Sequence, residues 1–164
     1  MMAEFKRIRK FTAGPHAGFN NDDAQRYGDY LERVVGLGRR VVSAEEIVAA
    51  AIPDDSPIHE QICGESDGEA IYERRLDLSR HLMRCIIVTT MVDDEPVESK
   101  AYHHVVTVSG KSGYTSERRV WKEPHLAEQV VAQALQELRA WRSRYVEYVE
   151  LAGVIASIDE AVAA

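Results

Sequence analysis

Apolar residues recur at alternating steps of four and three positions through the last quarter of the chain. This spacing is typical of one face of an α-helix, and after Pro124 the chain has no further proline and one glycine, Gly153. An unbroken helix from there to Ala164 would be roughly 60 Å long, which exceeds the width of a domain of this size. We therefore predict a long C-terminal helix, part of which projects or meets a partner. Its apolar face consists of Ala127, Val131, Ala134, Leu138, Trp141, Tyr145, Tyr148, Ala152 and Ile155.

Earlier in the chain the pattern predicts shorter helices. Asn21 or Asp22 is suited to cap a first helix, which a pair of glycines ends. Ser43 with Glu46 three residues later forms a capping box for a second helix, and residues 69–84 form a third. The first two helices and their glycine-containing link resemble a helix-turn-helix in outline, an outline also common among helical hairpins that bind nothing.

β-branched residues dominate the region between the third helix and the last one. Cys85–Val92 predicts a strand, residues 93–96 a polar turn, and residues 101–108 and Tyr114–Trp121 two further strands. Helices, then strands, then a helix define an α+β fold. We predict N-terminal helices, a three-stranded antiparallel meander and the long C-terminal helix.

This order divides the chain into three parts. We expect a basic N-terminal arm at residues 1–20, an α+β core at 21–123, and a long helix at 124–164 that packs on the core and offers a surface to a partner. Residues 1–42 carry eight basic and five acidic side chains, a local excess of positive charge on a chain of formal net charge -7. Both a solvated arm and a surface for an anionic partner fit this excess.

The cysteine count and the hydropathy restrict the setting of the protein. Two cysteines in 164 residues form no disulfide framework, and no apolar run approaches the ~18 residues of a membrane span. Charged residues interrupt the N-terminal segment where a signal peptide would be apolar. We expect a protein made and kept in a reducing cytoplasm, with no membrane contact.

Two His-x-x-x-Cys pairs are candidate metal ligands. His59 with Cys63, and His81 with Cys85, are spaced to share one helical face, and together they offer the four ligand types of a structural zinc site. The short Cys-x-x-Cys knuckle of such sites is absent. The alternative is a buried Cys85, a capping His59 and an exposed His81, and we expect neither metal nor cofactor.

Pro53-Asp54 followed by Glu98-Ser99-Lys100 resembles the arrangement of a nuclease superfamily in which carboxylates hold Mg²⁺ and a lysine stabilises charge at the phosphate. The alternative is a pair of turn acids and an exposed edge lysine. The sequence has no nucleophile elbow and no glycine-rich phosphate loop, so it favours a non-enzymatic protein.

The middle of the long helix combines arginines with aromatic residues. Arginine beside aromatic rings is suited to contact bases or phosphates, and equally to cover apolar surface with its stem. When the helix is aligned in heptads, its apolar stripe is too wide for a two-stranded coiled coil. We therefore expect the first half of the helix to cover the sheet. We expect its second half to pack against the N-terminal helices or a partner protomer. The predicted oligomer interface is Trp141, Tyr145, Tyr148 and Ile155. The predicted nucleic-acid or partner contacts are Lys6, Arg7, Arg9, Lys10, Arg39, Arg40, Arg139, Arg142 and Arg144.

Two segments carry a resemblance to a known group. Ser56-Pro57-Ile58-His59 precedes the stretch from Arg75 to Ile86, and a C-terminal segment runs from Ala134 to Tyr145. Over roughly residues 24–160 the chain resembles a family of uncharacterised proteins encoded by tailed bacteriophages and prophages. Residues 62–66 replace the aromatic and acidic stretch usual in that family. The resemblance implies a phage origin and transfers no activity.

These observations favour a non-enzymatic, phage-encoded oligomeric interaction protein that contacts DNA or a nucleoprotein complex through its basic N-terminal part. A structural component of the phage particle is the first alternative, and a metal-dependent enzyme acting on nucleic acid is the second. The expected partners are further copies of the chain, DNA, or a phage or host protein. The expected location is the cytoplasm of a bacterial host or the virion.

Overall fold

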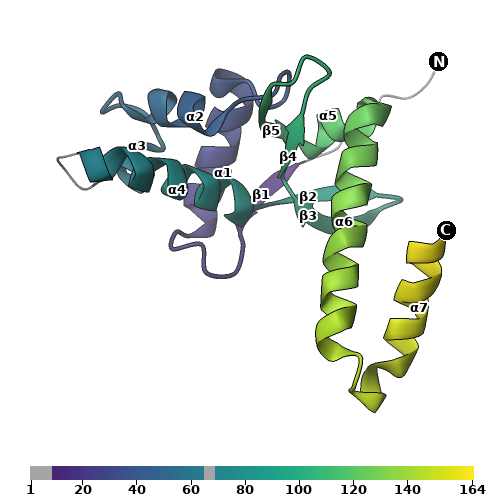
Figure 1. The fold of residues 1–164 in the computed structure, drawn as a ribbon. Helices are drawn as coiled ribbons and strands as arrows, with labels where there is room; N and C mark the ends of the chain where they lie inside the picture. Colours follow the sequence, from purple (N-terminus) through teal and green to yellow (C-terminus); the bar gives the residue numbers. More distant parts are fainter. Residues whose placement is uncertain (1–8, 65–68) are drawn as a thin grey trace, which may run out of the picture. The chain divides into compact units, whose positions relative to one another are not determined.

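The computed structural model describes residues 9–64 and 69–164, and for residues 69 and 70 the backbone alone (Figure 1). The chain divides into two units, Met1–Val120 and Trp121–Ala164, which we describe separately. The predicted α+β class is confirmed. The elements of the first unit are β1 (Lys10–Ala13), α1 (Asn21–Tyr30), the π-helical η1 (Leu31–Val35), α2 (Ala44–Ala51), α3 (His59–Cys63), α4 (Glu69–Cys85), β2 (Ile86–Val92), β3 (Glu95–Lys100), β4 (Tyr102–Val106), β5 (Ser112–Ser116) and most of α5 (Glu117–Lys122).

The three-stranded antiparallel sheet has the order β1-β2-β3. In its register Phe11 lies opposite Val88, and Val88 lies opposite Ser99. Phe11 and Val88 are buried, so this face of the sheet packs on the core. The predicted turn after β2 is present but shorter, because Asp93 and Asp94 both adopt positive φ and form a tight two-residue connection.

The strands differ from the predicted meander. The three-stranded sheet consists of β1, β2 and β3, whereas β4 and β5 pair with each other in a separate two-stranded sheet. Buried Ala101 separates β3 from β4, and its amide donates to the carbonyl of Ile86. The strand predicted over Tyr114–Trp121 ends at Ser116, where α5 begins. Helix is favoured beyond that point because Glu117 and Val120 are both buried, and a spacing of three places them on one helical face.

The first helix shows close packing against the N-terminal strand. Its N-cap is Asn20, one residue before the predicted candidates, and the Asn20 side chain accepts a hydrogen bond from the amide of Asp23. At Gly28 any Cβ would overlap the ring of Phe11, so a side chain at this position would displace β1 from the core. The helix continues into η1 and stops at Gly36, which adopts a left-handed conformation with φ 98°.

The predicted capping box of the second helix is confirmed. Ser43 accepts from the amide of Glu46, and the Glu46 carboxylate accepts from the amide of Ser43. This helix packs against α4. The bounds of α4 agree with the predicted helix over residues 69–84 to within one residue. The largest fully buried side chains of the first unit are Leu31, Leu37, Ile47, Ile58, Ile62, Leu82, Met83, Ile86, Val42, Val48 and Val88.

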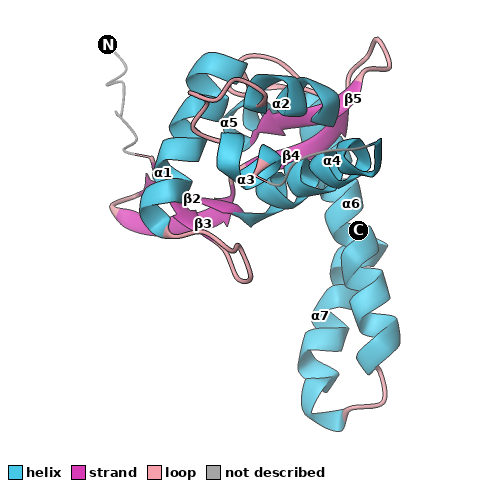
Figure 2. Cartoon of the chain, turned by 90° about the vertical axis from the view of Figure 1, so that its left-hand side faces the viewer, coloured by secondary structure: helices cyan, strands magenta, loops and turns pink. Residues whose placement is uncertain are grey.

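The second unit is a helical hairpin (Figure 2). Its elements are α6 (Pro124–Tyr145), the 3₁₀ turn η2 (Val149–Leu151) and α7 (Ala152–Ala163). Proline lies in the first turn of α6, as predicted. The long helix is present, but it ends at Tyr145 rather than continuing to the C-terminus, and Tyr148 adopts an extended conformation with ψ 109°. Folding back buries Ile155 and Ile158, which a single straight helix would expose.

Among the described helices, none is both long enough and apolar enough to span a membrane.

Candidate functional site

The basic N-terminal segment is the first predicted contact surface. Lys6 and Arg7 lie outside the described residues. Lys10 is exposed in β1, but Arg9 is largely buried, and its guanidinium pairs with the carboxylates of Glu32 and Glu117. The two oxygens of Glu117 both lie 2.7 Å from Arg9 Nη2. Arg9 therefore binds within its own unit and does not present its charge to a partner.

This ion-pair cluster also contains a buried tyrosine. The hydroxyl of Tyr102 donates to the carbonyl of Gly28 at 3.3 Å, and burial raises the pKa of Tyr102 well above its usual value. Burial likewise raises the pKa of the Glu117 carboxyl, although Arg9 opposes this shift. Because one guanidinium pairs with two carboxylates, the cluster holds the residue before β1 against η1 and α5. This is a structural arrangement rather than one that activates a group for proton transfer.

Arg39 and Arg40 lie in the turn after η1. Arg40 Nη1 is 2.6 Å from Glu46, and Arg40 Nη2 donates to the carbonyl of Val35. Arg39 donates to the carbonyl of Arg33 and remains exposed. The helix that would occupy the recognition position of a helix-turn-helix is α2, and its eight residues include no lysine or arginine.

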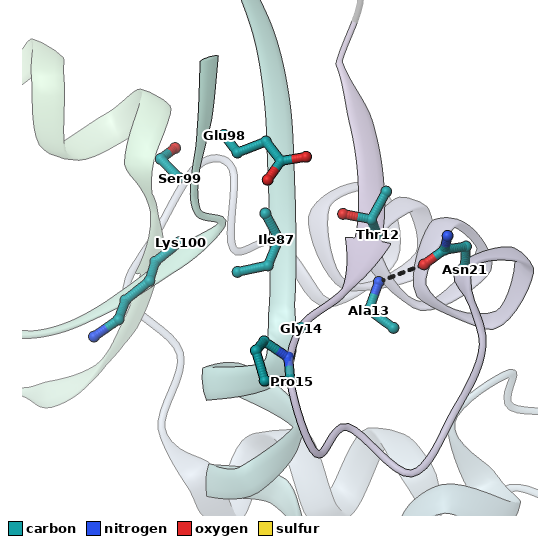
Figure 3. Close-up of a pocket in the computed structure, with 9 residues that line it drawn as sticks. All are labelled: Thr12, Ala13, Gly14, Pro15, Asn21, Ile87, Glu98, Ser99 and Lys100. Carbon is teal, nitrogen blue, oxygen red and sulfur yellow. Dashed lines mark hydrogen bonds between the residues drawn. The ribbon is translucent and has the colours of Figure 1, made fainter. Parts of the chain in front are cut away.

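The Glu98 and Lys100 pair lines an open pocket of about 490 Å³ on the exposed face of the three-stranded sheet (Figure 3). Thr12 and Asn21 line the same pocket, and the side chain of Asn21 accepts from the amide of Ala13. Lys100 points away from Glu98. The Asp54 of the suggested nuclease arrangement does not line this pocket.

Asp54 instead lies beside His59, with 3.6 Å between Oδ1 and Nε2. The structure therefore does not assemble the three residues of the nuclease arrangement into one site. The carboxylate and ammonium in the pocket form a polar edge of the sheet, and Glu98 is the one carboxylate among the described residues that line it.

The His and Cys pairs form two separate local contacts. His59 Nδ1 lies 2.8 Å from the carbonyl of Ala51, and Cys63 Sγ lies 3.6 Å from the same oxygen. Cys85 Sγ lies 3.4 Å from His81 Nε2. Among the described side chains, those of residues 9–64 and 71–164, no three of His, Cys, Asp or Glu are grouped so that they could hold a metal ion.

Cys85 is also poorly suited to act as a nucleophile. Burial raises the pKa of its thiol, with a smaller opposing effect from Arg84. Cys85 is the last residue of α4, and the partial negative charge at a helix C-terminus disfavours a thiolate. The Cys85–His81 contact is therefore a structural one.

Aromatic residues gather at the C-terminal end of α6. The ring centroids of Trp141 and Tyr145 are 5.1 Å apart, and those of Tyr145 and Tyr148 are 6.1 Å apart. Trp141 is half-buried, whereas 57% of Tyr148 is exposed. We name Trp141, Tyr145 and Tyr148 the aromatic face. Ile155, the fourth predicted interface residue, is instead buried in the hairpin.

The three arginines of α6 differ in their surroundings. Arg142 pairs with Asp159 of α7, with Nε 2.5 Å from Oδ1, so this ion pair links the two helices. The guanidinium of Arg144 lies 5.9 Å from the centre of the Tyr145 ring. Arg139 and Arg144 are exposed. The sequence identified the arginines but not Asp159, because its expected continuous helix kept these two residues far apart.

The sequence also gave no sign of the Arg9 cluster. Glu32 and Glu117 follow Arg9 by 23 and 108 positions, so no local spacing in the sequence connects them. Only pairing of the N-terminal strand with β2 brings Arg9 to η1 and α5.

Comparison with known proteins does not relate the chain to one of them: no family model, no curated protein and no solved structure matches it.

Proposed function

We propose that the protein is a non-enzymatic, oligomeric interaction protein that associates through the aromatic face of its C-terminal hairpin. The observation that carries this proposal is a row of neighbouring aromatic rings, two of them exposed, on a unit with few buried side chains. In the second unit the buried side chains are Leu126, Ile155 and Ile158. Tyrosine and tryptophan contribute strongly to protein interfaces because they combine large apolar area with few rotatable bonds.

The candidate chemistries on the remainder of the molecule support an interaction role. Glu98 and Lys100 lack Asp54 beside them, and the thiol of Cys85 is disfavoured as a nucleophile. DNA contact through the N-terminal part is not included in the proposal, because Arg9 and Arg40 are held in ion pairs and α2 carries no basic residue. The sequence resemblance supports a phage or prophage setting for such a protein.

The test is the native mass of the full chain, measured by light scattering over a range of concentrations. We expect an oligomer for the natural sequence. Because truncating an aromatic interface residue costs about 2 kcal/mol, Tyr148→Glu should weaken association by about thirtyfold. Tyr148 lies outside α6 and α7, so the variant should keep its helical circular dichroism.

A matched control is Val108→Glu. Val108 is 88% exposed in the first unit, so this change adds the same charge at another apolar surface position. It should leave the mass unchanged. A natural chain that stays monomeric at all concentrations would overturn the proposal.

A further inference from the structure

We propose that the hairpin docks on a second copy of itself in antiparallel orientation, with the two-fold axis passing near Trp141. This inference rests on the proposed function and specifies its geometry. It is carried by the distribution of charge along α6.

The two sides of the hairpin differ in polarity. The Arg142–Asp159 ion pair bridges the helices on one side. Trp141 is one residue before Arg142, so it is rotated by about 100° around the helix axis, away from the ion pair. On α7, Val154 is five residues before Asp159, is rotated by about 140°, and is half exposed. Both apolar side chains therefore point away from the ion pair.

Charge changes sign along α6. Its first part carries Glu128 and Glu137, and its last part carries Arg139, Arg142 and Arg144. Glu137 is four residues before Trp141 and Arg144 is three residues after it, so both flank Trp141 on the same face. Both are exposed. In an antiparallel pair centred on Trp141, Glu137 of each copy lies across from the partner's Arg144.

A parallel arrangement would place like against like. Glu137 would face the partner's Glu137, and Arg144 would face the partner's Arg144. Like charges across an interface disfavour association, so charge distinguishes the two orientations. The antiparallel pair is isologous: both copies use the same patch, which closes the assembly at two copies.

The test is a charge-reversal series on the full chain, with the dimer dissociation constant measured by sedimentation at low salt. In the antiparallel dimer Glu137→Arg makes two repulsive contacts with Arg144, and Arg144→Glu makes two with Glu137. Each single variant should weaken the dimer about tenfold, since exposed ion pairs have modest strength and each occurs twice. The double variant Glu137→Arg with Arg144→Glu restores the opposite-charge pairs and should return the constant to the natural value.

Matched controls are Glu160→Arg and Arg139→Glu. Both residues are exposed. Their substitutions reverse charge in the same way as the test variants but away from the face that carries Glu137, Trp141 and Arg144, so the dimer dissociation constant should not change. A dimer in which both single reversals behave like the controls, or in which the double reversal does not recover, would overturn the antiparallel geometry and leave the proposed function standing. A natural chain that is monomeric would overturn both.

Discussion

A single carboxylate, that of Glu46, connects the helix cap with two basic side chains. Glu46 accepts from the amide of Ser43 at 2.8 Å, pairs with Arg40 at 2.6 Å and pairs with Lys111 at 2.9 Å. Partial burial by itself would raise the pKa of Glu46, but the Ser43 amide, Lys111 and Arg40 outweigh that effect and lower the pKa to about 2. The carboxylate is therefore stabilised in its charged form by folding.

This shift predicts the pH dependence of the variant Glu46→Gln. A depressed pKa gives stability that is present above the unfolded value of 4.5 and is lost as the pH falls towards about 2. The Glu46 side chain is about one-third exposed, so solvent screening makes its contribution to stability smaller than the whole pKa shift would imply. We expect Glu46→Gln to lower the free energy of unfolding by about 1–2 kcal/mol at pH 7. Urea unfolding at pH 7 and at pH 2 measures it, and the difference from the natural chain should be much smaller at the lower pH.

The neighbouring change Glu45→Gln is the control. Glu45 is exposed in the same first helical turn and does not take part in the capping box, so its replacement should alter stability by only a few tenths of a kcal/mol. Equal losses for both variants would show that Glu46 acts only through the helix dipole.

At the scale of elements, Arg9 joins the N-terminal strand to η1 and α5. Its two partners, Glu32 and Glu117, are largely buried. Removing one member of a buried ion cluster is costly because the remaining charges stay in a poorly solvated site. The strand itself has four residues, so this side-chain anchor contributes much of what holds it.

We predict that Arg9→Met destabilises the first unit by about 3–5 kcal/mol at pH 7. Without Arg9 the pKa of the Glu117 carboxyl rises further, so protonation neutralises it more readily and the deficit should be smaller at pH 5 than at pH 7. Chemical denaturation at the two pH values checks this. Lys10→Met is the control, since Lys10 is exposed; a similar loss for both variants would contradict the assigned role of Arg9.

Elements with local signals were predictable from the sequence. Ser43 with Glu46, Gly36 and Pro124 mark helix ends through their own backbone chemistry, and the structure places helix ends at each of them. The strand β3 was missed because Glu95-Pro96-Val97-Glu98 looks polar. It forms because β2 supplies backbone partners to an exposed edge strand, which tolerates proline and charge.

The break after Tyr145 was missed for a related reason. The apolar spacing of α6 continues through residues 146–155, so local periodicity favours one helix. Return of α7 along α6 is favoured instead by burial of Ile155 and Ile158 and by the Arg142–Asp159 pair, which are contacts between elements. The aromatic face could be predicted because its members are close in sequence. The partner of Arg142 could not.

At the scale of the whole molecule, the main hydrophobic cluster lies within the first unit. Its buried members run from Phe11 to Tyr114. The hairpin contributes none of them. Folding of the first unit should therefore be separable from the association that we propose for the hairpin.

We predict that a chain ending at residue 120 keeps a cooperative thermal transition, because its core is complete, and is monomeric, because the aromatic face is missing. Circular dichroism and light scattering measure the two properties. Loss of the cooperative transition would show that the first unit depends on the hairpin, and a persistent oligomer would place the interface in the first unit.

The pairing of β1 with β2 has a consequence for protein synthesis. Phe11 finds Val88 as its neighbour, and Arg9 finds Glu117, which follows it by 108 residues. At ribosomal rates of about 5–20 residues per second, roughly 5–20 s pass between the synthesis of Arg9 and that of Glu117. The end of the chain that is translated first is thus among the last to be secured, since Arg9 is without its second carboxylate partner throughout that interval.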